Sequence, residues 1–426
     1  MKTARPNLLS VGGTFAFFVL ATLFTAVGLV AFGQSWQATG SFAPAHPAFL
    51  AGVHALLLGG LLSVYLGAAH QLCPVISERR IQGGGVIAMV HAALHLAGTA
   101  LMVAGFWLAR DHLLVIGGSL VTAGLLLFAL LALSALERRR SWEPESVGLY
   151  AGLWWLLAAV ALGLWMASFR AGWASLPVGL EQVRGLHLRV AFGGFFLQVL
   201  LGLSHRLVPM FLVSRRTGKT AAGLALLCLN LGLLLDTVGL LGELPRLVTA
   251  GDTLLGLAIL PHLVATACQL LSRLRPLGGS FWSYSLGTLG LTACAVLWLL
   301  QVWTPETLTL HAEWLALAAA LPLALIPIAF AVSARVIPFL VWQVACAPLI
   351  GRQKLPTVQQ LWSERLLWVE FGWVVAVVGT WGFALFAPQP AGLVAAMVAT
   401  AGLFATRALN CCQLWRRLRS FTPVAS

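Results

Sequence analysis

Residues 67–74 read GAAHQLCP and residues 202–209 read GLSHRLVP, so a Gly-x-x-His-x-Leu-x-Pro motif occurs twice. A degenerate third copy, AVSARVIP, occupies residues 331–338. The copies begin 135 and then 129 residues apart, and each follows a long apolar stretch. This spacing predicts three related blocks within a single membrane domain, roughly residues 1–136, 137–271 and 272–426.

The composition around the motifs is that of a membrane protein. The chain is 60% hydrophobic and 9% charged, with a mean hydropathy of +0.92, whereas soluble domains carry roughly a quarter charged residues. Runs of about 20 apolar residues can each cross a hydrocarbon core. We identify twelve such runs, near 14–33, 48–74, 85–107, 113–136, 148–168, 187–213, 220–242, 250–271, 281–303, 309–340, 366–387 and 390–413. The sequence predicts an all-α polytopic membrane protein of about twelve transmembrane helices, in three pseudo-equivalent four-helix arcs.

The net charge of +13 is distributed unevenly between the loops. Arginines and lysines gather in alternate loops, for example at residues 138–140, 273–275 and 416–419, and are sparse in the loops between. By the positive-inside rule, this asymmetry predicts that the N- and C-termini are cytoplasmic, in the cell inner membrane. We therefore interpret the basic surplus as a topology signal, and we expect no nucleic-acid partner.

Histidines lie at both ends of two motif helices, spans 2 and 6, and at the start of the third, span 10. His54, His187 and His311 are expected near the outer face, with His70 and His205 toward the cytoplasm. The helical rise separates His187 from His205 by roughly 27 Å, too far to share one metal ion. The sequence predicts either two layers of metal sites, drawn from these five histidines, or one layer of sites and one of structural histidines.

Ionisable side chains inside a membrane are costly and usually serve a site, and imidazole is a good ligand for haem iron and for copper. His91 and His95 lie one turn apart on span 3, where they could chelate a metal, or one could bind a haem. Arg184 and Arg189 flank His187 and could pair with haem propionates, or could anchor the helix at the interface. Glycines on these helices indicate close helix packing or room for a macrocycle.

Twelve spans with histidines on spans 2, 6 and 10 resemble subunit I of the haem-copper oxidases. The pattern Arg184-x-x-His187, followed by Gly202, His205 and Pro209, is similar to the second span of the nitric oxide reductase and C-type oxidase branch. The plan is also similar to that of NnrS-type haem/copper membrane proteins, which are linked to nitric oxide stress. The resemblance implies a haem cofactor with copper as a second candidate, an electron donor, and NO or O₂ as a gas ligand. It also implies haem-ligand roles for His54, His187 and His311.

The departures from that pattern limit the expected chemistry. The chain has no adjacent His-His pair, such as subunit I uses for copper, and span 10 carries His311 alone. Classical terminal oxidase activity is therefore not expected. We predict a haem-binding protein for electron transfer or for handling NO or O₂. The alternatives are a twelve-span secondary transporter whose histidines relay protons, although transporters more often show two six-span halves, and a structural partner that has lost its cofactor.

Overall fold

The structure, a computed structural model, describes residues 11–41, 43–77, 84–138, 142–215, 219–305 and 318–421. Within these ranges all regular elements are helical and no strand occurs. Among the described residues, twelve helices are long and apolar enough to cross a membrane. The prediction of an all-α polytopic membrane protein with twelve spans is confirmed. The predicted start of the tenth span, near residue 309, lies outside the described residues.

Most spans are one continuous helix, whereas spans 2, 6, 8 and 10 consist of consecutive segments. The single-helix spans are α1 (Val11–Thr39), α4 (Gly84–Trp107), α5 (Asp111–Glu137), α6 (Pro144–Arg170), α9 (Lys219–Leu241), α12 (Gly279–Trp303), α16 (Glu364–Phe386) and α17 (Pro390–Phe421). The segmented spans are α2 (Pro47–His54), η1 (Ala55–Leu62) and α3 (Ser63–Ser77); α7 (Leu180–Arg189), η2 (Val190–Leu197) and α8 (Gln198–Leu212); α10 (Pro245–Leu257) and α11 (Ile259–Leu271); and η4 (Leu321–Leu325) and α14 (Ile326–Ala345). Two short helices, η5 (Ala347–Leu349) and α15 (Val358–Leu361), follow α14.

Spans 2, 6 and 10 each contain a π-helical segment, namely η1, η2 and η4. The first two occupy residues 55–62 and 190–197, which are 135 residues apart, like the motifs themselves. A Gly-Gly pair lies within each of these two segments, and Pro322 lies within η4. π-Helical turns are rare and often lie at functional sites. Here η1 begins directly after His54, and η2 begins three residues after His187.

Prolines and left-handed residues define several helix ends. Pro47 and Pro144 lie in the first turns of α2 and α6, where proline's missing N–H is not needed. The motif prolines Pro74 and Pro209 lie inside α3 and α8, about one turn before the helices end. The left-handed backbone of Val213 (φ 51°) then caps α8. The prolines therefore mark the last turn of each motif helix and do not end it themselves.

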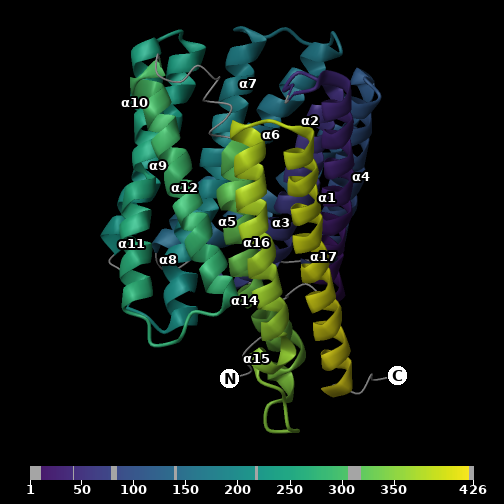
Figure 1. Cartoon of the computed structure of the whole chain (residues 1–426), viewed down its shortest axis with the longest axis vertical. Coiled ribbons are helices and arrows are strands. Elements are labelled where there is room, and N and C mark those ends of the chain that lie inside the picture. The colour runs from purple at the N-terminus through teal and green to yellow at the C-terminus, as the bar shows by residue number, and fades with distance from the viewer. Residues whose placement is uncertain are drawn as a thin grey trace.

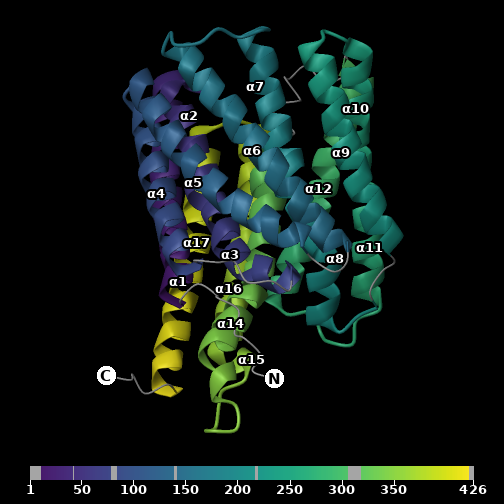
Figure 2. The same cartoon turned by 180° about the vertical axis from the view of Figure 1, so that it is seen from behind.

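The bundle has two flanks and a shared centre (Figures 1 and 2). Helices α9, α10 and α11 form one flank, and α1, α2 and α4 form the opposite flank. At the centre, Leu72 of α3, Leu207 of α8 and Val336 of α14 lie in one buried cluster. These three residues occupy the same position in the three copies of the motif. Corresponding faces of spans 2, 6 and 10 therefore pack against one another.

The glycines of the motif helices serve close helix packing. A Cβ on Gly202 would lie 3.0 Å from the Cα of Gly148, so α8 and α6 cross almost backbone to backbone. A Cβ on Gly194 would lie 2.6 Å from the Cβ of Trp155. Of the two interpretations of these glycines, packing through small residues is the one that the contacts favour.

Candidate functional site

The site is built around His54 and His187, which lie on spans 2 and 6. Both side chains line one cavity of about 220 Å³, whose other walls come from α4, α5 and α6. The structure therefore brings together two histidines that the sequence grouped only by their position in the blocks.

The two rings are held by the same kind of hydrogen bond. The Nδ1 atom of His54 lies 2.8 Å from the carbonyl oxygen of Leu50, and the Nδ1 atom of His187 lies 2.9 Å from that of Ala159. A carbonyl oxygen can only accept, so Nδ1 is the donor in both rings. When such an imidazole is neutral, its available lone pair is on Nε2. Metal-ligating histidines have the same tautomer when a backbone carbonyl accepts a hydrogen bond from their Nδ1 atom.

Two residues that sequence reasoning did not single out shape the space beside these rings. Phe106 of α4 stacks on His54, with ring centroids 4.6 Å apart and an interplanar angle of 28°. Gly163 of α6 faces His187, where an added Cβ would lie 3.2 Å from Cε1. The ring of Phe106 thus packs against the His54 imidazole, and the lack of a side chain at Gly163 leaves room for the His187 imidazole. No local sequence signal distinguishes Phe106 or Gly163 from the many other phenylalanines and glycines of the chain.

Two arginines lie on the lining of the same cavity. Arg184, predicted as a cofactor-binding residue, pairs with Glu181 one turn before it. Arg170, which the sequence analysis did not single out, donates from Nε to Asp111 at 3.1 Å. Each guanidinium has five N–H donors, more than one carboxylate uses, so both could also bind an anionic group in the cavity.

Arg189, the second arginine predicted to bind a cofactor, lies elsewhere. Its Nε donates to Asp252 at 2.9 Å and its Nη2 donates to the same carboxylate at 3.1 Å, while Asp236 lies 3.6 Å from Nε. The guanidinium also lies over the ring of Trp298, 5.2 Å from its centroid. Arg189 is 5% exposed, so its observed role is to neutralise two buried carboxylates between spans 6, 7 and 8.

A second histidine group lies on spans 2 and 3. His70 Nε2 and His91 Nδ1 are 2.9 Å apart, so one ring donates to the other. His95 Nε2 lies 3.0 Å from the carbonyl oxygen of Leu58 and 3.2 Å from the hydroxyl of Ser63. All three histidines are buried. The predicted pairing of His91 and His95 on one helix face thus extends to His70 on the neighbouring helix.

His205 contacts another buried histidine, His262 of α11. Their ring centroids are 5.9 Å apart with the rings nearly perpendicular. Neither ring nitrogen of His262 has a hydrogen-bond partner among the described residues. Both motif histidines, His70 and His205, therefore lie beside a second imidazole.

The histidines form two separate layers. His54 and His70 are 16 residues apart along span 2, which corresponds to roughly 24 Å of helix. Within the described ranges, no three histidine, cysteine or carboxylate side chains are grouped so that they could hold a metal ion. Each layer therefore offers pairs of imidazoles. His311, the third predicted member of the outer layer, lies outside the described residues.

A further buried ion pair was missed by the sequence reasoning. Arg407 of α17 donates from Nε and Nη2 to the carboxylate of Glu370 at 2.9 and 2.7 Å, and Nη1 donates to Ser333. Arg407 and Glu370 each interrupt an apolar run, and two opposite charges alone in neighbouring spans are the signal that could have indicated this pair. The pair ties spans 10, 11 and 12 together.

Comparison with known proteins adds no assignment: the chain matches no model of a known protein family and no curated protein sequence.

Proposed function

We propose that the chain is an integral membrane haem-binding protein, and that His54 and His187 supply imidazole ligands within their shared cavity. The observation that carries the proposal is the common tautomer of the two rings: each Nδ1 donates to a backbone carbonyl. This arrangement leaves an Nε2 lone pair on each ring for a metal, and it fixes the ring orientation before any ligand binds. The two Nε2 atoms would thus be the donors that hold the iron of a haem.

The arginines at the cavity support an anionic cofactor. Arg170 and Arg184 both line the cavity that holds the two imidazoles. Haem carries two propionates, and guanidinium groups bind carboxylates through paired hydrogen bonds. In this proposal, Arg184 binds a propionate, as predicted from the sequence. The second propionate-binding arginine is Arg170, where the sequence predicted Arg189.

The volume of the cavity adds one requirement. About 220 Å³ is enclosed, whereas most small-molecule pockets enclose roughly 300–1,000 Å³. The Phe106 ring, stacked on His54, occupies part of the space beside that imidazole. Seating a macrocycle against His54 therefore requires Phe106 to turn away from the histidine.

A haem held by His54 and His187 would supply one-electron chemistry and the binding of NO or O₂. In this proposal the chain orients the imidazoles through their Nδ1 hydrogen bonds, binds the propionates through Arg170 and Arg184, and lines the rest of the cavity mainly with apolar side chains. We place this site in the inner membrane, with cytoplasmic termini and with spans 2, 6 and 10 as the central helices of three related four-helix blocks. The meeting of Leu72, Leu207 and Val336 supports that block organisation, and the resemblance to oxidase subunit I supports the cofactor.

The transporter alternative draws on a different observation. The hydrogen bond between His70 and His91 and the adjacent His95 form a short chain of imidazoles inside the membrane region. Such a chain can pass protons between helices. It does not account for the arginine-lined cavity of His54 and His187, which is why we favour the haem protein.

An absorption spectrum combined with elemental analysis of the purified protein separates the two functions. We expect a Soret band, and iron in proportion to the chain. A colourless protein without iron or copper would contradict the proposed haem function and would favour the transporter.

A further inference from the structure

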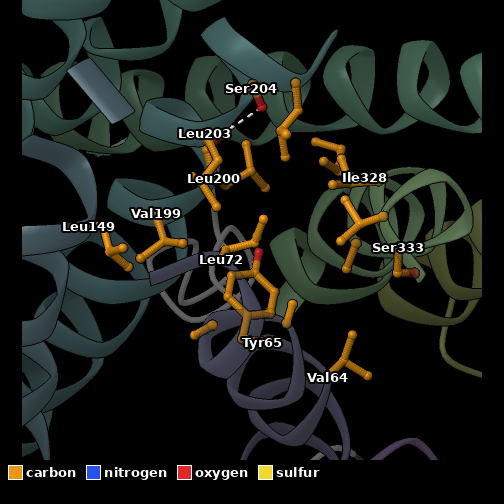
Figure 3. Close-up of a pocket in the computed structure, with 16 residues that line it drawn as sticks. Val64, Tyr65, Leu72, Leu149, Val199, Leu200, Leu203, Ser204, Ile328 and Ser333 are labelled. Atoms are coloured by element: carbon orange, nitrogen blue, oxygen red, sulfur yellow. Dashed lines mark hydrogen bonds between the residues drawn. The ribbon is translucent and has the colours of Figure 1, made fainter. Parts of the chain in front are cut away.

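A groove of about 400 Å³ lies at the surface of the bundle, where α1 and α17 pack side by side (Figures 1 and 2). Its outer wall includes Val19 of α1 and Cys412 of α17, which are both exposed. Its inner wall includes Val64 and Ser333, which also line a smaller cavity of about 80 Å³ between α3, α8 and α14 (Figure 3). In a bilayer, an exposed apolar side chain of a membrane span faces lipid, so the groove opens to the hydrocarbon.

The length of the groove matches one leaflet of a bilayer. Along α17, the groove extends from Phe404, which is buried, to Arg416, which is exposed. These two residues are 12 positions apart, which corresponds to roughly 18 Å of helix. One leaflet supplies half of a hydrocarbon core that is about 30 Å thick. The groove therefore has the depth that an acyl chain of a single leaflet requires.

The deep part of the groove carries no net charge, although Arg407 lines it. The Arg407 guanidinium lies 2.7 Å from the carboxylate of Glu370, and it also donates to the carbonyl oxygen of Phe330 at 2.7 Å and to the hydroxyl of Ser333. The ring of Phe330 covers the guanidinium, with 4.6 Å between the ring centroid and Cζ. Because this charge is neutralised within the protein and the other walls are mainly apolar, the deep part suits an acyl chain.

The other end of the groove is basic. Arg416 lines it and has no ion-pair partner among the described residues. Trp415 lines it as well, and the Arg419 guanidinium lies over the Trp415 ring, 5.0 Å from its centroid. This part of α17 continues past the described start of α1 (Figure 1). The positive-inside rule assigns this end to the cytoplasm, and tryptophan is enriched at the level of the lipid headgroups.

We propose that the groove binds one anionic phospholipid of the cytoplasmic leaflet, with an acyl chain between α1 and α17 and the headgroup phosphate at Arg416. Basic pockets between membrane helices on the cytoplasmic side bind anionic lipid headgroups. The unpaired guanidinium attracts the phosphate, whereas the ammonium group of a zwitterionic lipid opposes that attraction. This inference does not rest on the proposed haem function, because among the described residues the groove shares no lining residue with the cavity of His54 and His187.

Native mass spectrometry of the full chain, delipidated in detergent, measures the binding. The chain is titrated with phosphatidylglycerol, which is anionic, or with phosphatidylcholine, which is zwitterionic. We expect the wild type to bind one phosphatidylglycerol about 5-fold more tightly than phosphatidylcholine, the ratio that corresponds to about 1 kcal/mol for one basic residue near the membrane surface. Arg416→Gln should lower this ratio to about 1. Arg352→Gln, at another exposed arginine predicted to be cytoplasmic, is the matched control and should keep the ratio.

The acyl-chain part of the groove is tested by filling it. Ala408 lines the groove, and Ala408→Phe should lose most of its binding of both lipids. Ala405→Phe, at an exposed position three residues earlier on α17, is the matched control and should bind both lipids like the wild type. Inorganic phosphate at millimolar concentration should not displace phosphatidylglycerol, because the acyl chain supplies part of the affinity.

Each arm has a result that would overturn the lipid site. Equal affinity of the wild type for the two lipids, or an equal fall of the ratio in Arg416→Gln and Arg352→Gln, would contradict recognition of an anionic headgroup. Displacement by inorganic phosphate would assign the basic end to a free anion, and unchanged binding in Ala408→Phe would contradict the placement of the acyl chain. If Ala408→Phe fails to fold, the ratio in Arg416→Gln decides. A colourless protein with the expected lipid binding would overturn the haem function and retain this site.

Discussion

His54 and His187 are oriented in the same way from two different spans: each donates its Nδ1 hydrogen to a backbone carbonyl oxygen, of Leu50 and of Ala159. The acceptor for His54 lies on its own helix, one turn earlier, whereas the acceptor for His187 lies on α6. Tautomer and ring orientation are therefore set by two independent backbone contacts.

Gly163→Ala should weaken cofactor binding by about 10-fold, the lower end of the effect of changing a group that positions a metal ligand. The new Cβ would lie 3.2 Å from Cε1 of His187, so the imidazole must shift. The measurement is haem retention during titration with a competing haem-binding protein. Gly379→Ala, on α16 with nothing within 4 Å of the added Cβ, is the matched control. Equal retention in both variants would show that Gly163 does not position the site.

Phe106 should control access of the cofactor to His54. Phe106→Ala removes the ring that stacks on the imidazole at 4.6 Å, and we expect haem content at or above that of the wild type. Phe106→Trp adds bulk to a cavity of about 220 Å³, and we expect haem content to fall. Phe386→Trp, an exposed position on α16, serves as the control for the larger ring. Haem loss in Phe106→Ala, with none in Phe106→Trp, would contradict this role.

Arg189→Met should destabilise the protein by about 3–5 kcal/mol, because it leaves buried carboxylates without their cation. Asp252 and Asp236 both lie within reach of the guanidinium and are 4% and 0% exposed. The readout is the midpoint of thermal denaturation in detergent. Lys219→Met is the control, since this lysine is 71% exposed in its pair with Glu143 and such pairs contribute about 0–1 kcal/mol. Equal midpoints for the two variants would contradict a structural role for Arg189.

The ion pair of Arg189 with Asp252 and Asp236 could not be predicted from the sequence, whereas the spans could. The twelve spans follow from long apolar runs, and the grouping of His54 with His187 follows from their position at the start of motif helices. The partner of Arg189 does not follow, because Asp236 and Asp252 are 47 and 63 residues away and the choice depends on how spans 6, 7 and 8 are rotated. The predicted propionate contact was assigned to Arg189 by its closeness in sequence to His187, while the structure places Arg170 at the cavity.

The π-helical segments limit prediction in a related way. A regular helix fixes which residues share a face, but η1 begins directly after His54 and η2 begins three residues after His187, and a π-helical segment changes the helical phase. Counting residues from His54 therefore does not predict on which face of span 2 His70 lies. The inner group of His70, His91 and His95 was predicted only in part, as the pair His91 and His95 at i, i+4. The hydrogen bond between His70 and His91 came from the structure.

The orientation of the bundle is open to a reporter test. Arg352 and Lys354 lie in the exposed segment between α14 and α15, and Arg416 and Arg417 lie near the end of α17. By the positive-inside rule, both regions should be cytoplasmic. A fluorescent protein fused after residue 426 should fluoresce, and alkaline phosphatase inserted at residues 172–178, between α6 and α7, should be active. The reverse pattern would place His54 and His187 on the cytoplasmic side and contradict the proposed topology.

The most direct test of the account is the Soret absorbance per chain in His54→Ala, His187→Ala and the double variant. All three are compared with the wild type and with His112→Ala, an exposed histidine at the start of α5. The account predicts a shifted or weakened band in each single variant, near-complete loss in the double variant, and an unchanged spectrum in His112→Ala. A double variant that keeps the wild-type spectrum and haem content would show that the cofactor is bound elsewhere and would contradict the central claim.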